Sequence, residues 1–197
     1  MRPHYFMTPL IAVNIFIITT ASFLMPLWAT FVTHIGGDLR TAGIAICIFS
    51  IVIGICTIIT ARIEHVFRHY ENIVWITSAF FTLIYCGYLF IAHPWQLYLI
   101  QILLGLCGAV QCPALFALYH LYMSKTYSGF HWGIWNGFYN IAVGVGALIS
   151  AYVAHHFGFR IMFFTLIVLS AIGAVYTFFV MQKMKKFALS LINQPIK

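Results

Sequence analysis

TAGIAICIFSIVIGICTIIT, residues 41–60, is a run of apolar and small polar residues without a single charged side chain. An α-helix needs about 20 mostly apolar residues to cross the roughly 30 Å hydrocarbon core of a bilayer. A strand of a membrane barrel needs only about 10 residues and alternates apolar with polar positions. The run is too long and too uniformly apolar for a strand, so it predicts a membrane-spanning helix.

Five more runs of this kind occur along the chain. The six predicted spans lie at residues 9–31, 41–60, 73–92, 95–119, 132–154 and 161–181. Hydrophobic residues make up 63% of the chain and charged residues 7%, whereas soluble domains carry about 25% charged residues. No soluble core of this size could hide so much apolar surface. We therefore predict an all-α, multi-pass integral membrane protein with six transmembrane helices in residues 1–181 and a basic tail in residues 182–197.

The charged residues indicate how these spans are oriented. Six spans place both chain ends on one side, and that side would hold all the Lys and Arg residues except Arg40 and Arg160. They are Arg2, Arg62, Arg68, Lys125, Lys183, Lys185, Lys186 and Lys197. Because Lys and Arg concentrate in cytoplasmic loops, we predict that both termini are cytoplasmic, in a plasma membrane or bacterial inner membrane. The lysines of the tail would attract anionic membrane lipid.

The first three spans and the last three share a pattern. Asn14 precedes Pro26 by twelve residues, and Gln101 precedes Pro113 by the same interval. The second and fifth spans carry stripes of small residues with alternating spacings of four and three, which mark one face of a helix. The stripes are Gly43, Cys47, Ser50, Gly54, Thr57 and Ala61, and Gly133, Gly137, Asn140, Gly144, Ala147 and Ala151. Since an odd number of spans per copy inverts the second copy, the pattern predicts a 3+3 inverted repeat.

Three segments support a family resemblance: LWATFVTHIGGDLRTAG (27–43), QILLGLCGAVQCPA (101–114) and FGFRIMF (157–163). They resemble the first outer loop, the fourth helix and the loop into the sixth helix in one half of a major facilitator superfamily (MFS) transporter. Members of that family have two six-helix halves with the solute bound between them. The resemblance therefore implies a half-transporter that works as a homodimer or with a second six-helix half.

The loop ARIEHVFRHYEN (61–72) lies where that family carries a charged motif that latches the two halves together. The resemblance assigns this latch to Arg62, Glu64 and Arg68. The match is degenerate, because Thr60 replaces the expected Gly, and His65 and His69 stand where Arg or Lys is usual. The alternative is a solvated connecting loop.

The polar residues within the spans are the candidates for solute binding. The resemblance to the cavity-lining first and fourth helices favours Asn14, Ser22, Gln101 and Gln111, followed by Asn136 and Asn140 on the fifth. The alternative is that each amide bonds another helix, because a buried amide is costly unless it is paired. An uncharged set of this kind suits a small, neutral or weakly polar solute. No carboxylate lies in any span, so facilitated diffusion is favoured over proton-coupled pumping.

The small-residue stripes are candidates for the interface between halves. Glycine and serine let helix backbones approach closely, which drives association in lipid. The predicted interface consists of Gly43, Ser50, Gly54, Gly133, Gly137 and Gly144. The alternative is that both stripes pack within a single bundle.

Other classes of function have little support in the sequence. The net charge of +7 comes without a basic groove or a nucleic-acid-binding motif, so we expect no nucleic-acid partner. The five cysteines lie in apolar runs and do not have the spacing of metal ligands. On the predicted cytoplasmic face, only one histidine pair, His65 and His69, has the i, i+4 spacing of a helix. We expect no metal, cofactor or enzymatic activity. The sequence predicts a transporter permease, or alternatively a membrane partner, regulatory subunit or transporter fragment that moves no solute itself.

Overall fold

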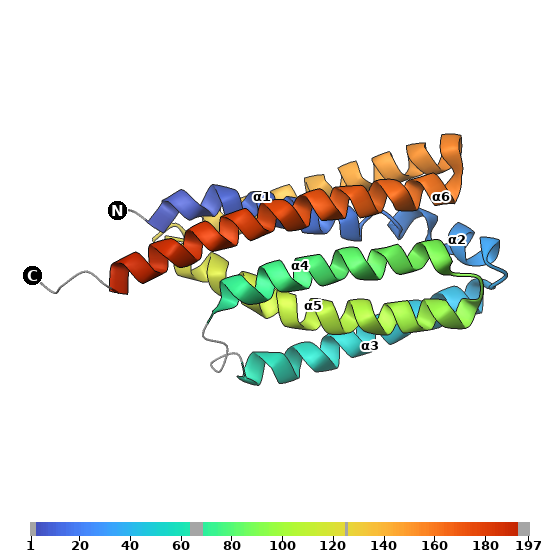
Figure 1. Cartoon of the computed structure of the whole chain (residues 1–197), viewed down its shortest axis with the longest axis horizontal. Helices are drawn as coiled ribbons and strands as arrows, with labels where there is room; N and C mark the ends of the chain where they lie inside the picture. Colours follow the sequence, from blue (N-terminus) through green and yellow to red (C-terminus); the bar gives the residue numbers. More distant parts are fainter. Residues whose placement is uncertain (1–2, 64–68, 125, 193–197) are drawn as a thin grey trace, which may run out of the picture.

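The computed structural model describes residues 3–63, 69–124 and 126–192, and all regular structure in these ranges is helical. Figure 1 shows long helices side by side in an elongated bundle. The elements in chain order are η1 (Pro3–Phe6), α1 (Met7–Ala21), η2 (Met25–Leu27), α2 (Trp28–His34), α3 (Leu39–Ile63), α4 (Tyr70–Gly87), η4 (Tyr88–Phe90), α5 (Pro94–Tyr122) and α6 (Ser128–Ile192). The prediction of an all-α protein is confirmed.

Five segments of the described ranges are long and apolar enough to cross a membrane, where the sequence predicts six. They are Met7–His34, Leu39–Arg62, Tyr70–Phe90, Pro94–Tyr122 and Ser128–Ala188. The last segment has 61 residues, about three times the length that one crossing needs. It contains both predicted spans 132–154 and 161–181. The number of separate helices therefore differs from the prediction because no loop divides the last two.

Two helical arms make up α6, and they meet at Gly158. This glycine has φ 81° and ψ 170°, a positive-φ conformation that residues with a Cβ rarely adopt. Figure 1 shows the chain turning back between the gold part of α6 and its red part. We call residues 128–157 the first arm and residues 159–192 the second arm.

The first predicted span, 9–31, is not one continuous helix. Pro26 lacks the backbone N–H that a helix interior requires, and its ring clashes with the preceding turn. The chain instead forms a 3-10 turn, in which Met25 N donates to Ser22 O at 3.1 Å and Leu27 N donates to Leu24 O at 3.1 Å. The helix therefore ends at Ala21 and restarts as α2.

Pro113 is accommodated differently, inside the unbroken helix α5. A proline at this position leaves the carbonyl of Ala109, four residues earlier, without its helical partner. Thr60 on α3 fills that vacancy, because its Oγ1 donates to Ala109 O at 2.7 Å. The hydroxyl thus joins α3 to α5 where the helix would otherwise be weakest.

The helices pack along a small number of lines of contact. α3 packs on α5, α1 packs on α6, and α4 packs on both α5 and α6. Two apolar clusters lie near the two ends of the bundle. The termini-end cluster includes Phe6, Leu10, Leu118, Trp135 and Met184. The far-end cluster includes Phe23, Val32, Tyr88, Leu97 and Met162.

A layer of buried polar side chains separates the two clusters. On α1, for example, Asn14 and Thr20 come after Val13 of the termini-end cluster and before Phe23 of the far-end cluster. We call this set the polar layer: Asn14, Thr20, Ser78, Gln111, Ser170 and Thr177. Hydrocarbon cannot solvate such groups, so their partners have to come from within the bundle.

Both ends of the described chain lie at the same end of the bundle (Figure 1). The rings of Phe6 and Phe187 have centroids 5.2 Å apart, and Lys183 Nζ donates to Tyr5 Oη at 3.1 Å. Residues 182–192, predicted as part of a tail, continue the second arm as helix. No Pro or Gly follows Met181 in these residues to end the helix.

Candidate functional site

Two of the predicted solute contacts, Ser22 and Gln111, are tied to neighbouring groups inside the bundle. Each exposes 4% of its surface. Gln111 Nε2 donates to Ser78 Oγ at 3.0 Å and so links α5 to α4. Ser22 Oγ donates to Thr19 O at 2.9 Å, within its own chain segment. Neither side chain faces open space in this conformation.

The matched pair Asn14 and Gln101 is also buried, with 3% and 6% of the surface exposed. Gln101 Nε2 lies 3.5 Å from Tyr88 Oη, at the limit of a hydrogen bond. Asn14 Nδ2 has no hydrogen-bond partner within the described residues. A buried amide without a partner costs about 1–3 kcal/mol. The burial of Asn14 therefore destabilises the fold unless water or another group bonds its Nδ2.

Asn136 and Asn140 lie on the exposed face of the first arm. Asn136 Nδ2 donates to Trp132 O at 3.0 Å, and Asn140 Nδ2 donates to Asn136 O at 2.8 Å. Each amide therefore bonds the preceding turn of its own helix. Of the six predicted solute contacts, these two are accessible from outside the bundle.

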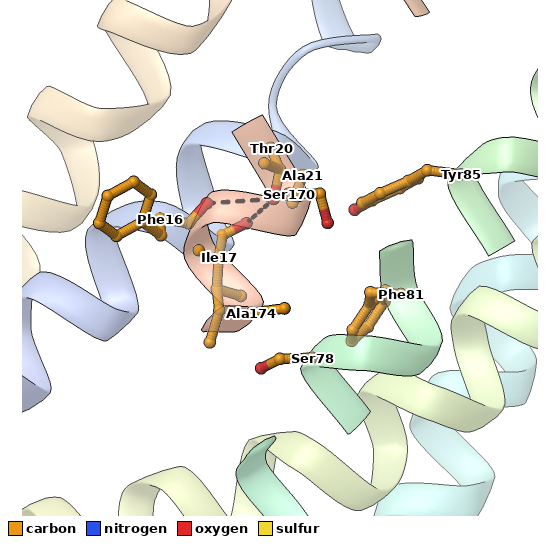
Figure 2. A pocket seen from close by; sticks show the side chains of 10 residues that line it. Phe16, Ile17, Thr20, Ala21, Ser78, Phe81, Tyr85, Ser170 and Ala174 are labelled. Atoms are coloured by element: carbon orange, nitrogen blue, oxygen red, sulfur yellow. Dashed lines mark hydrogen bonds between the residues drawn. The ribbon is translucent and has the colours of Figure 1, made fainter. Parts of the chain in front are cut away.

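A small pocket opens in the polar layer between α1, α4 and the second arm (Figure 2). Its volume is about 40 Å³, room for roughly three water molecules, because a water site needs about 10–15 Å³ on this measure. Figure 2 shows Tyr85 and Ser170 pointing toward each other from opposite walls. Thr20 and Ser78 add two more hydroxyl groups to the lining. The pocket suits water and is too small for an organic solute.

Sequence reasoning did not identify these four hydroxyl residues. A usable signal exists, since Ser78 and Tyr85 are seven positions apart on one face of the third span. Thr20 and Ser170 lie within apolar runs of the first and last spans. Polar residues recurring at mid-depth in three spans indicate a shared buried layer.

A much larger groove lies at the termini end, between the start of α4, the last turns of α5 and the start of the first arm. Its volume is about 590 Å³, and it is a wide, open hollow on the surface of the bundle rather than an enclosed cavity. We call it the aromatic groove: Tyr70, Pro113, Phe116, Ala117, His120, Leu121 and Trp132. This described lining contains no Asp, Glu, Lys or Arg, so the groove carries no fixed charge.

Aromatic rings packed edge to face or at a tilt form the wall of the aromatic groove and join α5 to the first arm. Tyr119 is fully buried, and its ring lies 4.3 Å from that of Trp135. Its hydroxyl donates to His131 O at 2.6 Å. Phe116 and Trp132 meet edge to face, with centroids 5.9 Å apart and planes at 71°, the geometry that aromatic pairs favour.

The glycines divide into two groups with different surroundings. A Cβ added at Gly43, Gly54, Gly133, Gly137 or Gly144 would meet no atom within 4 Å. A Cβ at Gly146 would lie 2.6 Å from Thr19 O, and one at Gly105 would lie 3.2 Å from Phe49 O. The second group brings helices together within the bundle, whereas the predicted interface glycines face outward. Ser50 is exposed on the same face of α3.

Of the predicted latch, Arg62 is exposed on the last turn of α3. Glu64 and Arg68 lie outside the described residues. Beside them, Thr60 makes a contact that the sequence did not indicate, the hydrogen bond to Ala109 O described above.

Comparison with known proteins adds one finding to this architecture. The sequence model of the Major Facilitator Superfamily matches residues 10–192, from α1 to the last residue of the second arm. No curated protein and no solved structure matches the chain. The family match covers every long apolar helix of the bundle, both of its apolar clusters and the layer between them. This integral membrane protein therefore belongs to the major facilitator superfamily of transporters.

Proposed function

We propose that this bundle is one six-helix half of a transporter that moves a small, uncharged solute by alternating access. The observation that carries the proposal is the match of residues 10–192 to a family of transporters. The two arms of α6 would supply the fifth and sixth crossings, since each exceeds the roughly 20 residues that a crossing needs. With Met7–His34 as a first, broken crossing, the chain would cross six times.

Helix packing supports a 3+3 repeat. The proposed repeat relates the first crossing to the fourth, the second to the fifth and the third to the sixth. It therefore relates the contact of α3 with α5, the second and fourth crossings, to the contact of α1 with the first arm, the first and fifth crossings. Both contacts include a close backbone approach at a glycine, but Gly105 lies on the fourth crossing and Gly146 on the fifth, so the repeat relates the two contacts and not the two glycines. The repeat also relates the contact of α4 with α5 to that of α1 with the second arm, and returns the contact of α4 with the second arm to itself.

The outward stripes support a partner across α3 and the first arm. We propose a second six-helix half there, either another copy of this bundle or a different chain. Gly43, Ser50 and Gly54 on α3, with Gly133, Gly137 and Gly144 on the first arm, would let partner helices approach closely. The solute would bind between the halves.

The charges support the proposed orientation. Arg62, Lys183 and Lys186 are exposed at the termini end, which would be cytoplasmic by the bias of Lys and Arg toward that side. Arg62 belongs to the proposed latch, together with Glu64 and Arg68. In the apolar helices of the described chain, Glu71 in the first turn of α4 is a carboxylate at a helix end, and no carboxylate lies deeper in these helices. We therefore propose facilitated diffusion.

Asn136 and Asn140 are the polar residues proposed to meet the solute first. Asn14, Ser22, Gln101 and Gln111 would reach it only when the helices move apart, as alternating access requires. The unpaired Nδ2 of Asn14 favours such a second state, because a solute or water there would satisfy it.

Uptake into vesicles containing the purified protein tests transport. We expect saturable entry of at least one small uncharged solute, absent from empty vesicles. Replacing both Asn136 and Asn140 with Leu should slow uptake roughly fivefold or more, as loss of one hydrogen bond to the solute predicts. Thr165→Val is the matched control, because Thr165 also bonds its own helix, at Ile161 O, but on the second arm. No uptake of any solute above empty vesicles would overturn the proposal.

The burial of Asn14 and Gln101 inside one bundle favours a second candidate, a membrane partner or regulatory subunit that moves no solute. In that case these amides belong to the packed interior and never contact a solute. The bundle would then alter the flux of a partner transporter, and have none alone.

A further inference from the structure

We propose, resting on the transport function above, that the aromatic groove is a solute site and that its solute is uncharged, amphipathic and carries an aromatic ring. The groove offers the space that the polar layer lacks, about 590 Å³ against about 40 Å³. An organic molecule therefore fits at the termini end of α5 and not among the buried hydroxyl groups.

The rings of the groove are arranged to receive another ring. Phe116 meets Trp132 edge to face and still exposes 42% of its surface. Aromatic pairs prefer edge-to-face or offset geometry, so a planar group lying on Phe116 extends an existing pattern. Tyr70 supplies a further ring to the lining.

The wall behind these rings is held in place. Tyr119 Oη donates to His131 O, and its ring packs on Trp135. At Pro113 the wall is fixed by the bond from Thr60 to Ala109 O. A site built on packed helices with satisfied polar groups keeps its shape when the solute leaves.

The polar groups of the groove call for an amphipathic and uncharged solute. Among the described lining residues, the polar side-chain atoms are those of His120, Tyr70 and the indole nitrogen of Trp132, and His120 is exposed. The same face of α5 continues toward the far end as Leu106, Leu103 and Leu99, all exposed. The ring of an amphipathic solute can pack on an apolar surface of this kind while its polar end stays in water, whereas a solute without a ring would lose hydrogen bonds to water without replacement.

Binding of 4-nitrophenyl glucoside to the protein in lipid nanodiscs tests this proposal, with glucose as the matched ligand that lacks the ring. The nitrophenyl group quenches tryptophan fluorescence at short range, and Trp132 lies in the groove. We expect saturable quenching that glucose neither produces nor reverses. Trp132→Phe should reduce the quenching and leave the part that comes from Trp135, whose ring lies 6.4 Å from that of Trp132. Trp95→Phe, at the opposite end of α5, should retain the quenching in full.

Two substitutions of similarly exposed side chains locate the site. Phe116→Ala should weaken binding roughly tenfold, while Leu106→Ala, on the same face and equally exposed at 43%, should leave it unchanged. Phe116→Leu keeps the apolar bulk and removes the ring, so it should also weaken binding. This variant replaces Phe116→Ala in the test if Phe116→Ala proves unstable. Unchanged binding in both Phe116 variants, or equal binding of glucose, would overturn the proposal.

Uptake measured on the same protein separates this proposal from the transport function. Uptake of a sugar without binding of the glucoside would overturn the groove assignment and leave transport standing. Binding of the glucoside at Trp132 with no uptake of any solute would support the groove and overturn transport.

Discussion

The hydroxyl of Thr60 makes a stability contribution that can be measured on its own. Its Oγ1 lies 2.7 Å from Ala109 O, the carbonyl that Pro113 leaves without a helical partner. Thr60→Val keeps the shape of the side chain and removes the donor. We expect a loss of about 1–2 kcal/mol in the free energy of unfolding, because a hydrogen bond between membrane helices contributes on this scale.

Reversible unfolding in mixed detergent micelles measures this loss. Thr57→Val is the matched control, one turn earlier on α3 and part-buried to a similar degree. No hydrogen bond from its hydroxyl to another helix is found in the described chain. Equal destabilisation by the two variants would show that the bond to Ala109 O contributes nothing specific.

Individual polar residues show where sequence reasoning stops. The equal spacing of Asn14–Pro26 and Gln101–Pro113 predicts that both amides lie at comparable positions along their helices. It does not give the direction in which a side chain points around the helix axis, which depends on helix packing. Both amides face the interior of the bundle, whereas Asn136 points outward. The sequence pattern therefore does not predict which of these polar side chains are exposed.

At the scale of an element, Asp38 begins α3 and makes its start sensitive to pH. Thr41 donates to Asp38 Oδ1 from both its hydroxyl and its backbone N–H, each at 2.7 Å. These two hydrogen bonds hold the pKa of Asp38 below its ordinary value of 3.8, and the bond from the Thr41 hydroxyl has the larger effect. Because the pKa is lower in the folded state, the stabilisation is fully present above pH 3.8 and is lost as the pH falls through the folded pKa.

Asp38→Asn should therefore be less stable than the wild type at neutral pH, since it keeps an acceptor but loses the charge at the N-terminus of the helix. The difference in melting temperature should shrink as the pH is lowered below 3.8. Thermal unfolding at a series of pH values measures it. Glu71→Gln is the control, because it removes the charge of a different one of the three acidic residues of the chain. A difference that stays constant down to pH 2 would contradict the assignment to Asp38.

The helices themselves were largely predictable, because the cost of a charge in hydrocarbon marks each span as a charge-free run. The exceptions depend on backbone geometry. Pro26 and Pro113 look alike in the sequence, yet one breaks its helix and the other does not. At Pro113 the freed carbonyl of Ala109 accepts a hydrogen bond from Thr60 on another helix, a contact that a local pattern does not contain. Gly158 likewise joins two predicted spans through one positive-φ residue.

On the scale of the whole molecule, the bundle is unevenly covered by its own helices. In its most apolar stretch α3 buries 11% of its residues and α5 buries 44%. The exposed face of α3 combines large Ile side chains, which suit lipid, with the stripe of small residues that includes Gly43 and Gly54. Lipid needs no small residues, so this stripe and that of the first arm are better explained by close approach of another helix.

Gly137→Leu tests that explanation in the intact chain. A Cβ at Gly137 meets no atom of its own bundle, so the larger side chain should fold normally and hold a partner helix away. We expect energy transfer between differently labelled copies in a bilayer to fall, with an association constant at least roughly tenfold lower. Val175→Leu, which adds bulk to an exposed position of the second arm, should leave the transfer unchanged. Equal energy transfer in Gly137→Leu and wild type would exclude the first arm from the interface. A wild type that shows no transfer at any density would instead require a different chain as the second half.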